Sequence, residues 1–112
     1  MQACIRHLVV DEHDDLETCT PADPMDFEID LRAVVGPQGE KGDETFRFTV
    51  CSVRYIERMC LEEGAVFGCH RLVVQQYDHR KISAAVTDLV ESLEAATWRE
   101  LAQMLAQYGR RV

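Results

Sequence analysis

The sequence predicts an α+β fold, with an antiparallel sheet of about four strands, helices packed on one face, and the order βββαβαα. Two observations predict the sheet: apolar and polar residues alternate in residues 25–35 and again in residues 44–50, as they do in strands with one buried face. A third predicts the helices, because residues 78–93 carry a single apolar stripe at helical spacing. Strands grouped ahead of helices are typical of the α+β class.

Two strands and a long loop are expected first. Residues 3–10 are apolar and β-branched enough for a strand. Residues 11–24 form an acidic loop that Pro21 and Pro24 close. The alternation in residues 25–35 then predicts the second strand. Its inward-facing residues are Phe27, Ile29 and Leu31.

A hairpin is expected next. Residues 36–43 contain three glycines and a proline between two alternating segments, which is typical of a hairpin loop. The third strand follows in residues 44–50. Its inward-facing residues are Phe46, Phe48 and Val50.

The second half of the chain predicts a helix, a strand and two further helices. Residues 52–64 have apolar residues at helical spacing, with Gly64 placed as a C-terminal cap. Residues 65–77 are too apolar in the middle to alternate, which favours a central strand covered on both faces. Asp78 is expected to cap the next helix, and Thr97 with Glu100 has the spacing of a capping box before the last one.

Charge is distributed very unevenly along the 112 residues. The first 30 residues contain nine acidic side chains and one arginine, which accounts for the whole formal net charge of −8. Such a field attracts cationic partners and repels nucleic acid and anionic membranes. We therefore expect a protein partner, with no binding of nucleic acid or membranes. The length fits one domain over residues 1–112.

The N-terminal residues lack the pattern of a secretory signal, and no apolar segment is long enough to cross a membrane. A cytoplasmic protein is expected. The five cysteines are scattered without a C-x-x-C pair, which favours buried, reduced thiols over disulfides or a zinc site.

Catalytic motifs are absent from the sequence. The chain has no G-x-S-x-G, phosphate-binding loop or H-E-x-x-H motif, so we predict no enzyme and no catalytic, cofactor-binding or metal-binding residues. Asp11, His13 and Asp15 could gather a divalent cation, but Leu16 and Ala22 occupy the positions where a calcium loop needs glycine and glutamate. A small metal-dependent enzyme centred on His13 remains an alternative.

An acidic loop on an otherwise neutral body is typical of an inhibitor of a basic protein. Nucleases and similar toxins carry basic grooves, and an acidic inhibitor associates with them rapidly. The candidate contact residues are Asp11, Glu12, Asp14, Asp15, Glu17 and Asp23.

Four segments together resemble a known family. They are "DDLETCTPADPMDFEIDL", "GPQGEKGDETFRFTVCS", "GCHRLVVQQYD" and "TWRELAQMLAQYG". Their order and spacing are similar to those of the bacterial Immunity protein 8 family, the antitoxins of polymorphic and contact-dependent inhibition toxins. The resemblance extends over nearly the whole chain.

The resemblance implies that the chain performs no chemistry itself. It would be a cytoplasmic immunity protein that binds and neutralises the C-terminal domain of a cognate toxin, which in such systems is often a nuclease. A regulatory module that binds some other basic protein remains a further alternative. The sequence leaves the toxin, its activity and the oligomeric state of the chain open.

Overall fold

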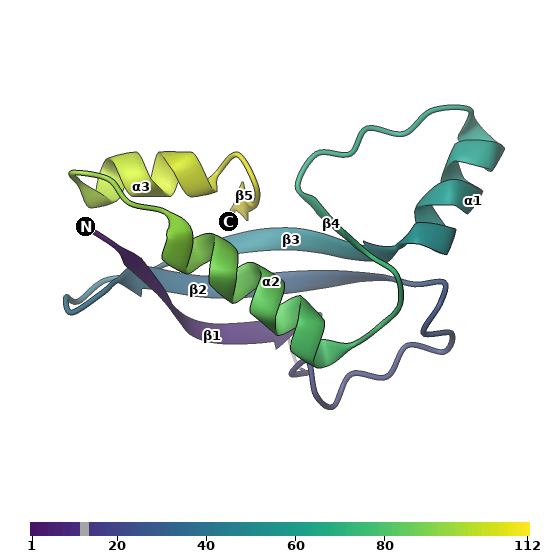
Figure 1. Cartoon of the computed structure of the whole chain (residues 1–112), viewed down its shortest axis with the longest axis horizontal. Helices are drawn as coiled ribbons and strands as arrows, with labels where there is room; N and C mark the ends of the chain where they lie inside the picture. The colour runs from purple at the N-terminus through teal and green to yellow at the C-terminus, as the bar shows by residue number, and fades with distance from the viewer. Residues whose placement is uncertain (12–13) are drawn as a thin grey trace.

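The computed structural model describes residues 1–11 and 14–112. Within them the α+β class and the order βββαβαα are confirmed, and a short strand is added near the C-terminus (Figure 1). The strands are β1 (Ala3–Val10), β2 (Glu28–Pro37), β3 (Glu44–Ser52), β4 (Arg71–Val74) and β5 (Arg110–Arg111). The helices are α1 (Val53–Glu63), α2 (His79–Ser92) and α3 (Trp98–Leu105).

The first three strands pair in sequence order as an antiparallel sheet. The register between β2 and β3 sets Leu31 opposite Phe48 and Ala33 opposite Phe46, and all four side chains are buried. The period of two therefore places the predicted inward-facing residues on one face. Polar residues such as Asp30 and Arg47 alternate with them on the opposite face, where the two form an ion pair at 3.0 Å.

The sheet is mixed rather than wholly antiparallel. β4 runs parallel to β3, because α1 and the segment after it return the chain to the sheet in the direction of β3. The fifth strand, β5, pairs antiparallel with β3 at Phe46 and Arg47. β5 is too short to show an alternation of apolar and polar residues, so the sequence pattern could not reveal it.

The prediction of a central strand over residues 65–77 is wrong. Only Arg71–Val74 form a strand, and β4 lies at the end of the order β1-β2-β3-β4. His70 has a positive φ of 55° and turns the chain immediately before β4. Phe67 is 92 % exposed in the connection before this turn. An apolar run without alternation does not distinguish a buried strand from an exposed loop.

The helices begin at the predicted caps. Asp78 accepts hydrogen bonds from the backbone N–H groups of Arg80 and Lys81 at the start of α2, and Thr97 accepts one from Glu100 at the start of α3. These two helices pack into one core cluster with the sheet. The buried residues of α2 and α3 are Ile82, Val86, Val90, Leu101, Ala102 and Leu105.

α1 contributes to the fold differently from the other helices. Ser52 caps its N-terminus and Gly64, at a φ of 82°, caps its C-terminus, as the sequence predicts for the glycine. None of its side chains is fully buried. Figure 1 shows α1 extending beyond the end of β3, on the side of the molecule to which the loop between β1 and β2 also belongs.

Candidate functional site

The segment between β1 and β2 is tied to the sheet where it begins. It contains the acidic stretch predicted at residues 11–24, and its whole length, residues 11–27, is here called the acidic loop. Asp11 adopts a positive φ of 48°. Its backbone N–H donates to the carbonyl of Asp30 at 2.9 Å, and its carboxylate accepts from the N–H of Asp30 at 3.2 Å. Val10 and Asp14 exchange two backbone hydrogen bonds. Asp11 and Asp14 are therefore fixed relative to the sheet, while Glu12 and His13 lie outside the described residues.

Two of the predicted contact carboxylates also shape the loop. Asp15 Oδ1 accepts hydrogen bonds from the backbone N–H of Thr18 at 2.8 Å and from its hydroxyl at 2.9 Å. These bonds, the backbone one first, hold the pKa of Asp15 below its usual value. Asp23 Oδ1 accepts from the N–H of Met25 at 2.9 Å. Both carboxylates therefore brace turns within the loop.

Tyr77, in the segment before α2, anchors the acidic loop from one side. Its hydroxyl donates to the carbonyl of Leu16 at 2.6 Å, and its backbone N–H donates to the carbonyl of Pro24 at 2.7 Å. Its ring meets the buried ring of Phe27 edge to face, with centroids 5.3 Å apart. Burial raises the pKa of the Tyr77 hydroxyl, which therefore stays protonated as a donor. The loop is held at both its start and its end.

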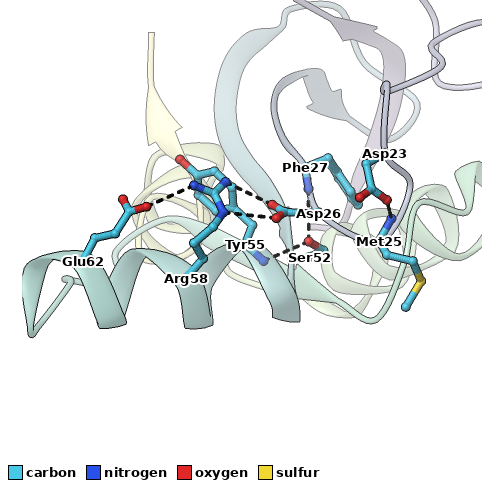
Figure 2. Close-up of polar contacts among 8 residues, drawn as sticks. All are labelled: Asp23, Met25, Asp26, Phe27, Ser52, Tyr55, Arg58 and Glu62. Atoms are coloured by element: carbon cyan, nitrogen blue, oxygen red, sulfur yellow. Dashed lines mark hydrogen bonds and ion pairs between the residues drawn. The ribbon is translucent and has the colours of Figure 1, made fainter.

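The start of α1 anchors the same loop from the other side (Figure 2). Ser52 Oγ accepts from the backbone N–H of Phe27 at 3.1 Å and from that of Tyr55 at 3.2 Å. Arg58 donates to both carboxylate oxygens of Asp26 at 3.1 Å. This bidentate contact keeps the pKa of Asp26 below its usual value. The end of the acidic loop and the first turns of α1 thus form one connected structure.

The acidic loop curves around an open concavity. Its carboxylate-bearing lining residues are Asp11, Asp14, Asp23, Asp26 and Glu28. Two of these carboxylates are neutralised by ion pairs, Asp26 with Arg58 and Glu28 with Arg71 at 2.9 Å. Among the described residues, no ion pair involves Asp11, Asp14 or Asp23. The concavity therefore carries net negative charge.

The six predicted contact residues divide into three groups. Asp11, Asp14 and Asp23 line the concavity. Asp15 and Glu17 are exposed on the loop but do not line it, and Glu12 lies outside the described residues. Asp26 and Glu28 were not predicted as lining residues, although both belong to the same acidic run. Their partners come from α1 and β4, and no local pattern indicates that pairing.

Other reactive groups lie apart from one another. No group of three or more His, Cys, Asp or Glu that could hold a metal ion occurs within residues 1–11 and 14–112. The alternative site centred on His13 lies outside these residues. His70 Nε2 is 3.1 Å from the carbonyl oxygen of Ala106. The cysteines are free, as expected, but Cys60 and Cys69 are exposed rather than buried.

An acidic concavity on an α+β body makes this chain a candidate binding protein. The family comparison identifies which kind: the Immunity protein 8 model matches residues 3–110. The chain belongs to this family of immunity proteins, which act in polymorphic toxin systems by binding a cognate toxin and are not enzymes. The expected resemblance is confirmed. No curated protein and no solved structure matches the chain.

The helices of the described residues are too short or too polar to cross a membrane.

Proposed function

We propose that this immunity protein, acting in the cytoplasm as a single domain, neutralises the C-terminal domain of a basic, nuclease-type toxin. In this proposal the acidic loop covers the cationic surface with which the toxin binds its anionic substrate. Contact-dependent inhibition is the delivery system we favour for the toxin. The observation that carries the proposal is the concavity with three carboxylates that lack an ion pair within the described chain, Asp11, Asp14 and Asp23.

Two properties of the loop support a binding role over a merely solvated one. Its backbone is held by Tyr77 and Ser52, and its Asp26 carboxylate by Arg58, through contacts that come from outside the loop. An ordered loop loses less conformational entropy when it binds a partner than a disordered one does. In addition, residues 31–112 carry equal numbers of acidic and basic side chains, so the field of the molecule originates at this end and orients an approaching cation toward it.

The experiment compares two variants with the same change in net charge. The test variant is Asp11→Asn, Asp14→Asn and Asp23→Asn; asparagine tolerates the positive φ of Asp11 and can replace Asp23 in its turn. The control is Asp43→Asn, Asp88→Asn and Glu91→Gln, which neutralises three exposed acids outside the loop. The binding partner is the C-terminal domain of the product of the gene directly upstream.

Association should slow by about tenfold at low salt for the loop variant and much less for the control. The difference should shrink as salt is added, because screening removes steering. Among cells that co-express the toxin domain, those with the loop variant should grow more slowly than those with the control variant. Equal association rates for the two variants would overturn the proposed role of the acidic loop. Failure of the unaltered chain to protect such cells would instead favour a regulatory module with another partner.

A further inference from the structure

Two large apolar side chains, one on α1 and one in the connection after it, are exposed to solvent. Leu61, in the last turn of α1, is 80 % exposed, and Phe67, in the connection from α1 to β4, is 92 % exposed. We call this pair the apolar knob. Single exposed apolar residues are ordinary, whereas larger exposed apolar patches with a polar rim mark interaction sites.

The connection from α1 to β4 leaves the apolar knob outside the core. Gly64 ends α1 with a positive φ, and its N–H donates to the carbonyl of Cys60 at 2.8 Å. A Cβ atom added at Gly64 or at Gly68 would have open space around it. Phe67, Gly68 and Cys69 are accordingly exposed in the connection from α1 to β4.

Charge surrounds the apolar knob on α1. Glu57, Glu62 and Glu63 are exposed on the same helix. Arg58 is held by Asp26 on one side and lies 3.6 Å from Glu62 on the other, so its charge is already compensated. Apart from the Arg58–Asp26 pair, α1 exposes three glutamates and one arginine, Arg54, so this surface is net negative, with the same sign as the concavity of the acidic loop.

α1, which carries Leu61, and the loop between β1 and β2 lie toward the same end of the molecule (Figure 1). The contacts of Ser52 and Arg58 with the loop fix the first turns of α1 relative to it. One partner with a positively charged surface can therefore meet both.

We propose, on the basis of the proposed function, that the apolar knob enters an apolar pocket with a basic rim on the same toxin domain that the acidic loop engages. Aromatic residues, Phe included, are enriched in protein–protein interfaces, where a few central side chains carry most of the binding energy. The loop then provides the rate of association, and the knob provides the lifetime of the complex. A second copy of this chain is a poorer occupant, because its acidic surface would face another acidic surface.

The test uses Leu61→Ala and Phe67→Ala, with Val112→Ala as a matched control. Val112 is 70 % exposed and follows β5, away from α1. All three side chains are exposed, so unfolding midpoints should be unchanged. With the upstream-encoded toxin domain as probe, Phe67→Ala should raise the dissociation rate by about tenfold or more while the association rate stays within about twofold. Val112→Ala should change neither rate.

The native thiols give a second readout. Cys60 and Cys69 are exposed on either side of the knob in sequence, so bound toxin domain should slow their reaction with a maleimide. This inference is overturned if both knob variants dissociate at the rate of the unaltered chain and bound toxin domain does not slow the labelling. The proposed function would still stand. Absence of binding by the unaltered chain would overturn both. Self-association of the unaltered chain that Phe67→Asp abolishes would overturn the inference too, because it identifies a second copy as the occupant.

Discussion

Arg58 and Asp26 join α1 to the acidic loop through two parallel hydrogen bonds. The Nε and Nη2 atoms of Arg58 each donate to a different carboxylate oxygen of Asp26 at 3.1 Å (Figure 2). The hydrogen bond to Asp26 is the main cause that raises the pKa of Arg58, and the same bond lowers the pKa of Asp26. The pair connects the two surfaces that we propose to bind one toxin.

Replacing Arg58 by glutamine should weaken toxin binding more than it weakens the fold. Arg58 lies at the surface, where ion pairs contribute little to stability, so the unfolding midpoint should fall only slightly. The position of α1 relative to the loop should become less defined, which raises the dissociation rate. Titration calorimetry and urea unfolding measure the two effects. Arg54→Gln removes the same charge from the same helix as a control, and an equal loss of affinity in that variant would contradict the role of the pair.

Stability should fall as the pH drops below about 3.8. The pKa values of Asp15 and Asp26 are lowered from 3.8 in the folded chain, the first by the backbone N–H of Thr18 and the second by Arg58. A lowered folded-state pKa contributes stability that is present above the unfolded value and is lost as the carboxylate becomes protonated. Urea midpoints between pH 7 and pH 3 measure the loss. Asp15→Asn and Asp26→Asn should each reduce this pH dependence, and an unchanged slope in both would contradict the assignment.

Gly109 should not tolerate a larger side chain. A Cβ atom added there would lie 2.7 Å from the ring of Phe48, which is buried in the core. Overpacking of this kind costs about 1–3 kcal/mol of unfolding free energy. Gly68→Ala is the control, because a Cβ at that position has open space and should leave the free energy of unfolding nearly unchanged. Equal urea midpoints for the two variants would refute the close contact.

The sequence predicted the elements that have regular patterns. Alternation located β2 and β3, and Asp78 and Thr97 located the helix starts, because capping and periodicity are local properties. The prediction that Phe67 lies in a covered strand was wrong, because apolar character alone does not reveal whether a neighbour covers a side chain. The sequence also failed to predict the direction of β4. The predicted helix between β3 and β4 could have indicated the parallel direction of β4, because neighbouring parallel strands are joined by such a crossover.

The acidic concavity was predictable only in part. Charge counting located Asp11, Asp14 and Asp23 in one loop, which follows directly from the sequence. The neutralisation of Asp26 by Arg58, 32 residues away, depends on the tertiary fold. A local count of carboxylates therefore overestimates the free charge of the loop.

Arg6 should control the mobility of the hairpin between β2 and β3. Its guanidinium donates to the carbonyl oxygens of Pro37, Glu40 and Gly42 at 3.0, 2.6 and 3.3 Å. Arg6→Met should accelerate amide hydrogen exchange in residues 38–43. Toxin affinity should stay unchanged, because this hairpin lies at the opposite end of the sheet from the acidic loop (Figure 1). Exchange rates equal to those of the unaltered chain would show that the three hydrogen bonds do not hold the loop.

Tyr77→Phe should loosen the acidic loop and change the response of the protein to alkali. The substitution removes the 2.6 Å hydrogen bond to the carbonyl of Leu16, which costs about 0.5–1.5 kcal/mol. Burial raises the pKa of Tyr77 above its usual value of 10. The folded state therefore favours the protonated hydroxyl, and stability from this group is present below pH 10 and is lost as the pH rises above it.

The Tyr77→Phe variant should be less stable than the unaltered chain at pH 8, and the difference should narrow between about pH 10 and pH 11 because phenylalanine does not ionise. Thermal unfolding across this range measures both effects. Tyr108→Phe is the control, since Tyr108 is half exposed and lies outside the acidic loop. If the stability of both variants changes with pH in the same way, ionisation of Tyr77 does not account for the loss of stability in alkali.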